Sequence, residues 1–112
     1  MIWSRSDRPA RMAVEWDTRS VFSNPRRSVS PLADARTDFT ARVELTGLPA
    51  NQAIFYRVTF EDAQSGVASE PWFGHLRSAP SQRRDIRFVW SGDTVGQGFG
   101  INPDIGGMRI YE

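Results

Sequence analysis

The stretch Ala53-Ile54-Phe55-Tyr56-Arg57-Val58-Thr59-Phe60-Glu61 decides the fold of this 112-residue chain. Its side chains alternate strictly: Ile54, Tyr56, Val58 and Phe60 fall on one face, while Phe55, Arg57 and Thr59 fall on the other. Alternation over this length predicts a half-buried β-strand, because successive side chains of a strand point to opposite faces. The segment therefore predicts the centre of a sheet with an apolar inner face.

Shorter segments on both sides carry the same signal and predict further strands at residues 1–5, 12–18, 39–45 and 67–77. Pro71 interrupts the last of these, which favours an edge position or a bulge, because proline lacks the N–H that a ladder needs. Residues 24–38 are rich in proline, serine and charge, and predict a long connection with a short edge strand near residues 27–29.

No helix-period segment of useful length precedes residue 100, so the sequence predicts an all-β fold. Six or seven short strands at this spacing are typical of a β-sandwich. The aromatic residues at alternating positions are the expected core: Trp3, Trp16, Phe39, Tyr56, Phe60 and Phe73.

Composition excludes several classes of function. The net charge is +1, so nothing in the charge favours nucleic acid or an anionic membrane as a partner. The chain has no run of about 18 apolar residues, the length that a membrane span needs. It contains no cysteine and no lysine, which excludes thiol catalysis, cysteine-ligated zinc, a Schiff-base lysine and a phosphate-loop lysine.

A different pattern begins after the polar, proline-containing residues 78–85, which are typical of an interdomain linker. Residues 86–91 are nearly all apolar, which is typical of a strand buried on both faces, and Asp93 and a glycine-rich loop follow directly. A carboxylate at the carboxyl end of a buried strand is a common position for metal ligands and catalytic groups in α/β enzymes, although Asp93 could also cap the next turn. The loop glycines Gly96, Gly98 and Gly100 lack the spacing of a nucleotide-binding loop and favour a tight backbone turn.

Three other features have a functional and a structural interpretation. His75, the single histidine, is more simply a surface or core residue than a metal ligand. An exposed Trp72 could contact a neighbouring domain or a partner. Arg83, Arg84 and Arg87 favour a solvated linker over an anion site.

Two stretches resemble known families. Residues 45–49 (LTGLP) and 55–58 (FYRV) resemble the corner between the fifth and sixth strands of a fibronectin type III module. The resemblance implies a fibronectin type III or immunoglobulin-like sandwich. It also implies that the Tyr56 hydroxyl bonds back to the backbone near Gly47 or Leu48.

The order of parts resembles the alkaline phosphatase D family: a sandwich, a Ser-Ala-Pro linker, then residues 88–94 (FVWSGDT) and 96–103 (GQGFGINP). These calcineurin-like metallophosphoesterases are typically exported, and hydrolyse phosphate mono- and diesters with a cluster of iron and calcium type. The resemblance therefore implies metal-assisted hydrolysis and a periplasmic or secreted parent. It makes Asp93 the candidate first metal ligand. Many members have Ser-Cys-Gln where this chain has Ser91-Gly92-Asp93, and the wider superfamily has a histidine where Val95 stands.

Together these observations predict three parts: a sandwich over residues 1–80, a linker over 81–85, and the truncated first strand and loop of an α/β metallophosphoesterase domain over 86–112. We expect this chain alone to be inactive and to bind no cofactor, with its own catalytic domain as partner in the longer enzyme. An orphan strand at 86–91 would join its own sandwich, pair with a second copy in a dimer, or be poorly ordered. The alternative is a non-catalytic fibronectin type III-like binding or spacer module.

Overall fold

The structure, a computed structural model, describes residues 1–87 and residue 104. Six strands and one short 3-10 helix follow one another along the chain: β1 (Ile2–Arg5), β2 (Ala10–Asp17), β3 (Arg26–Ala33), η1 (Ala35–Thr37), β4 (Thr40–Val43), β5 (Ala53–Asp62) and β6 (Trp72–Arg77). The all-β prediction is confirmed for this part of the chain.

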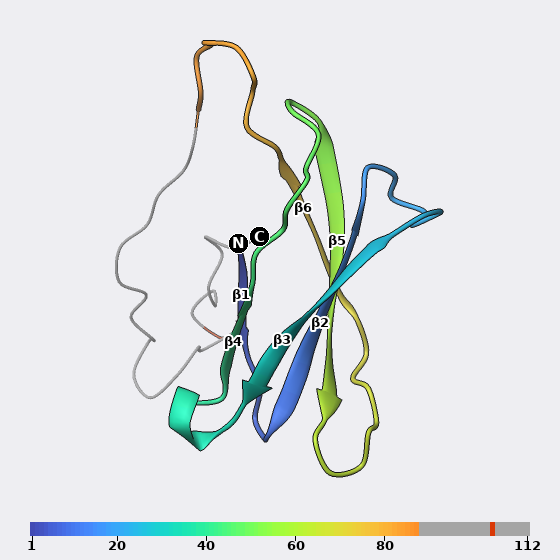
Figure 1. Cartoon of the computed structure of the whole chain (residues 1–112), viewed down its shortest axis with the longest axis vertical. Helices are drawn as coiled ribbons and strands as arrows, with labels where there is room; N and C mark the ends of the chain where they lie inside the picture. Colours follow the sequence, from blue (N-terminus) through green and yellow to red (C-terminus); the bar gives the residue numbers. More distant parts are fainter. Residues whose placement is uncertain (88–103, 105–112) are drawn as a thin grey trace.

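The strands form two antiparallel sheets of unequal size. Among the described residues, the larger sheet has four strands in the order β3-β2-β5-β6, and the smaller sheet consists of β1 and β4 (Figure 1). β5, the strand with the clearest alternation, lies in the interior of the larger sheet between β2 and β6. β6 and β3 are its two edges, which explains why prolines occur within β3 and just before β6.

The core lies between the two sheets. Its fully buried members include Met12 and Val14 of β2 and Ile54 of β5, which meet Ile2 and Val43 from the smaller sheet. These are the inward positions that alternation predicts for β2 and β5. Burial of such apolar side chains is the main source of stability in a domain of this size.

Two aromatic residues that were predicted to lie in the core are exposed to solvent instead. Trp3 is 61% exposed, because it alternates with the buried Ile2 on a four-residue strand. Phe73 is 66% exposed and lies on the outer face of β6 beside Phe22. Phe39 is half-buried and does not belong to β4; its φ of 56° places it in a left-handed turn before the strand.

The connection predicted over residues 24–38 is in large part a strand. β3 is eight residues long and pairs with β2 along most of its length. The register shifts between Arg11 and Ala13, and at this point the buried hydroxyl of Ser30 accepts a hydrogen bond from the backbone N–H of Met12 (3.0 Å). The serine thus satisfies a donor that the irregular ladder would leave unpaired, so a polar sequence is compatible with strand structure here.

Tyr56 does not form the predicted bond to the Gly47 region. Its ring lies over Gly74, its direct partner on β6, and a Cβ atom added to Gly74 would overlap the phenol. The carbonyl of Gly47 accepts a hydrogen bond from the guanidinium of Arg26 instead (3.3 Å). Because Gly74 has no side chain, the ring of Tyr56 can pack directly on the backbone of the edge strand β6.

Replacement of Gly74 by alanine is expected to lower the free energy of unfolding by about 1–3 kcal/mol, the usual cost of overpacking. Urea denaturation measures the change. In a Tyr56→Ala background the same replacement should cost far less, because the clashing ring is absent. Equal costs in both backgrounds would show that Gly74 is needed for its backbone conformation and not for space.

Candidate functional site

The residues predicted to act on a substrate or metal lie outside the described part of the chain. Asp93 and the loop glycines Gly96, Gly98 and Gly100 are among them, so their roles stay predictions. Within residues 1–87 and 104, no group of three or more histidine, aspartate or glutamate side chains could hold a metal ion. In the same part of the chain, no helix is long and apolar enough to cross a membrane.

The secondary candidates are spread over the surface and do not form a site. His75 is exposed on the outer face of β6, where its ring centroid lies 6.4 Å from that of Phe55. Arg84 is exposed and donates a hydrogen bond to the side chain of Asn51 (2.8 Å). Trp72 is 79% exposed, as the domain-contact interpretation requires.

The chain just before the predicted linker is fixed to the body of the fold. The buried Ser78 donates its backbone N–H to the Gln52 carbonyl (2.9 Å), and its hydroxyl accepts from the Gln52 N–H (2.9 Å) and contacts the Pro49 carbonyl. The Asn51 N–H also donates to the carbonyl of Ala79 (3.0 Å). The predicted linker therefore begins near a defined point beside the turn that precedes β5.

A second polar centre holds the turn that links β2 to β3. The carboxylate of Asp17 is buried and accepts hydrogen bonds from the backbone N–H groups of Asn24 (2.8 Å) and Arg19 (3.1 Å). Next to it, the guanidinium of Arg26 lies 5.1 Å from the ring centroid of Trp16, within cation–π range. These residues line a cavity of about 450 Å³, but each polar group named here already has a partner in the fold.

The same hydrogen bonds set the acidity of Asp17. The bond from Asn24 is the main cause that lowers the pKa of this carboxyl below its ordinary value; burial opposes it, and the bond from Arg19 adds to it. Because the folded-state pKa lies below the unfolded one, Asp17 stabilises the fold fully above the unfolded pKa of about 3.9. That contribution is lost as the pH falls through the folded-state pKa.

We expect Asp17→Asn to lower the urea midpoint at pH 7, since the neutral amide accepts the two backbone bonds less strongly. The difference from the unmodified chain should shrink as the pH is lowered below about 4, where the unfolded chain begins to take up a proton on this carboxyl, and it should be lost below the folded-state pKa. Glu44→Gln, at an exposed position just after β4, is the matched control and should leave the midpoint unchanged. A difference that persists unchanged at low pH would assign the effect of Asp17→Asn to packing.

The outer face of the larger sheet carries an aromatic and charged cluster. Arg57 forms an ion pair with Glu15 (Nε–Oε2, 2.6 Å) and lies over the ring of Phe22, 4.9 Å from its centroid. Phe22 in turn packs edge-on against Phe73, at 6.0 Å between ring centroids. The cluster fixes the turn that contains Phe22, whose φ of 50° needs such support.

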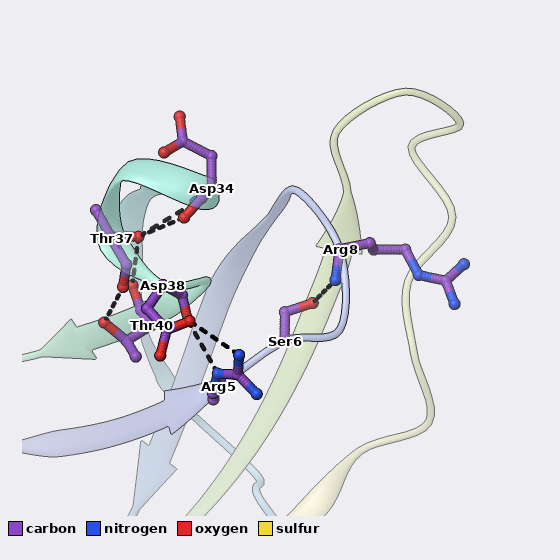
Figure 2. Close-up of polar contacts among 7 residues, drawn as sticks. All are labelled: Arg5, Ser6, Arg8, Asp34, Thr37, Asp38 and Thr40. Carbon is purple, nitrogen blue, oxygen red and sulfur yellow. Dashed lines mark hydrogen bonds and ion pairs between the residues drawn. The ribbon is translucent and has the colours of Figure 1, made fainter.

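The corner where β1 ends is closed by polar contacts, as Figure 2 shows. Arg5 donates to both the backbone carbonyl and the carboxylate of Asp38, each at 2.9 Å. The hydroxyls of Thr37 and Thr40 donate to each other's carbonyls (3.2 and 2.7 Å). The Thr37 hydroxyl also accepts from the backbone N–H of Asp34 (3.2 Å), the N-cap residue of η1, and so completes a capping box. The long side chain of Arg5 is thereby held toward the segment that leads into β4.

Comparison with known proteins agrees with this description. The model of one protein family, the PhoD-like phosphatase N-terminal domain, matches residues 1–80. The matched range contains all six strands and ends just after Ser78, where the chain is tied to the turn before β5. Comparisons with curated proteins and with solved structures give no match. The chain thus belongs to the PhoD-like phosphatases, in which residues 1–80 are the N-terminal domain.

Proposed function

We propose that this chain is the N-terminal accessory part of a longer, metal-dependent phosphatase that hydrolyses phosphate mono- and diesters. The observation that carries the proposal is the family match over residues 1–80. In this proposal residues 1–80 are a fibronectin type III-like sandwich, residues 81–85 are a linker, and residues 86–112 begin the catalytic metallophosphoesterase domain. The longer enzyme acts in the periplasm or outside the cell.

The described residues supply no ligand set for a metal cluster, so the chemistry is assigned to residues that follow them. A cluster of iron and calcium type would polarise the phosphoryl oxygens and activate a water. The role of the described part is to support its own catalytic domain. Two features favour this role: the fixed exit of the chain at Ser78, and the exposed Trp72.

Hydrolysis of p-nitrophenyl phosphate and bis-p-nitrophenyl phosphate tests the proposal. The longer protein should hydrolyse at least one of these esters, and chelation of its metals should abolish the reaction. The 112-residue chain should be inactive with or without added calcium and iron. Metal-dependent hydrolysis by the 112-residue chain contradicts the assignment of the chemistry. Inactivity of the longer protein with both esters favours a non-catalytic binding or spacer module.

A further inference from the structure

Two arginine side chains meet at the point where the chain leaves the first domain. Arg77 is the last residue of β6, and Arg84 lies in the predicted linker. Nε of Arg77 (3.3 Å) and Nη1 of Arg84 (2.8 Å) both donate a hydrogen bond to the side-chain oxygen of Asn51. Because both bonds end on the same oxygen atom, the two guanidinium groups lie close together.

The fold holds Asn51 in position between them. Its φ of 56° is left-handed, a conformation that asparagine adopts more readily than most residues. The backbone N–H of Asn51 donates to the carbonyl of Ala79 (3.0 Å), and that of the neighbouring Gln52 donates to the hydroxyl of the buried Ser78 (2.9 Å). The contacts that fix the exit of the chain therefore also fix the acceptor on which the two arginines meet.

The positive charge of this pair is not balanced by the fold. Within residues 1–87 and 104, neither Arg77 nor Arg84 forms an ion pair with a carboxylate. The amide of Asn51 accepts their hydrogen bonds but carries no charge, so the two like charges repel each other. Each guanidinium has five N–H donors, and in the same part of the chain each gives only one of them to a protein acceptor. An anion that lies between the two groups would remove the repulsion and accept further hydrogen bonds.

The surroundings of the pair also favour an anion. Arg77 and Arg84 line a cavity of about 430 Å³, and the other charged residues that line it in the described part of the chain are Arg87 and Asp85. With three guanidinium groups and one carboxylate, the cavity has a net positive charge. Sequence position alone favours a solvated linker for Arg84 and Arg87. The contact with Arg77 changes that interpretation, because Arg77 belongs to β6 and the sequence does not place it beside them.

A phosphate group fits this arrangement better than other small anions. A guanidinium is a planar fork, and its parallel N–H groups match two oxygens of a phosphate. A phosphate group has enough oxygens to accept hydrogen bonds from two arginines at once, and as a monoester it carries a charge of about −1.5 to −2 at pH 7. A carboxylate has a single charge and only two oxygens, and a chloride ion has no fixed geometry for a fork to match.

We propose that Arg77 and Arg84, with Arg87 beside them, bind a phosphate group, either inorganic phosphate or the phosphate of a monoester. The bound group joins the end of β6 to the predicted linker, and so strengthens the contacts that hold the exit of the chain at Asn51. The site contains none of the residues to which the proposed hydrolysis is assigned, Asp93 included. It therefore goes beyond the proposed function and does not depend on it.

Titration of the 112-residue chain with sodium phosphate tests the proposal, with the amide resonances of Asn51 and Ala79 followed by NMR at constant ionic strength. These resonances should shift and reach saturation, whereas sodium chloride at the same ionic strength should not shift them. Equal shifts with chloride overturn the proposal, because they show screening of charge rather than binding. Glycerol phosphate separates the two sources of the ligand. The same shifts with this ester assign the site to phosphate groups in general, and shifts with inorganic phosphate alone assign it to the free anion.

Variants of the 112-residue chain identify the groups that bind. Arg84→Gln should raise the dissociation constant for phosphate at least about tenfold, since it removes charge-assisted hydrogen bonds. Arg84 lies outside the six strands, so this variant should keep the urea midpoint of the unmodified chain. Arg77→Lys keeps the charge but not the planar fork, and should weaken binding less than Arg77→Gln does.

Arg36→Gln, which removes an exposed arginine of η1, is the matched control and should leave the dissociation constant unchanged. A dissociation constant that Arg84→Gln leaves unchanged overturns the proposed site. Because the titration uses the 112-residue chain and no phosphatase assay, that result leaves the proposed function intact.

Discussion

Replacement of Trp16 by alanine is expected to lower the free energy of unfolding by about 3–5 kcal/mol, the range for truncation of a large core aromatic residue. Trp16 is 4% exposed and belongs to the core cluster with Val14 and Ile54. Its ring also supports Arg26, which bridges to the Gly47 carbonyl on the other side of the cavity. A loss of this size is a large share of the 5–15 kcal/mol that stabilises a typical domain.

Urea denaturation followed by far-UV circular dichroism measures this change, and Trp3→Ala is the matched control. Trp3 is the same residue type on an exposed face, so its truncation should change stability by less than about 0.5 kcal/mol. Similar losses for the two variants would contradict the assignment of Trp16 to the core and of Trp3 to the surface. Comparable stability of Trp16→Ala and the unmodified chain would contradict the assignment of Trp16 to the core.

The sequence predicted those strands whose apolar alternation is long. β5 and β2 are such strands, and their inward residues Ile54, Val58, Met12 and Val14 are all buried. The pattern failed where strand structure depends on pairing rather than on apolar content. β3 is polar because it lies at an edge, and only its pairing with β2 identifies it as an eight-residue strand.

The face of a short strand is the least predictable feature. With four residues, β1 offers too few alternating positions to decide whether Ile2 or Trp3 faces the core, and size favoured the tryptophan wrongly. The exposure of Trp72 also depends on sheet membership, which is set by contacts between residues far apart in sequence. The one available signal was its position as a large aromatic residue next to a strand-breaking proline.

The second large effect that we expect concerns catalysis. In the longer protein, Asp93→Asn should reduce metal-dependent hydrolysis of p-nitrophenyl phosphate more than about 100-fold. Loss of a residue that only supports a metal ligand already lowers metal affinity or activity 10–100-fold, so loss of a ligand should lower them further. Asparagine is the weaker ligand because its amide is neutral and binds a hard cation less strongly than a carboxylate does. Metal content per molecule, measured by mass spectrometry, should fall together with activity.

Asp85→Asn is the control, since Asp85 is an exposed carboxylate in the predicted linker and should affect neither activity nor metal content. If Asp93→Asn lowers the thermal stability but keeps both metal and activity, the carboxylate caps the following turn, as the simpler interpretation of its position holds. If metal is retained and only activity falls, Asp93 contacts the substrate or the attacking water. The three outcomes can be told apart. Loss of a metal ligand lowers the metal content, loss of a cap lowers the stability, and loss of a reacting group lowers the rate alone.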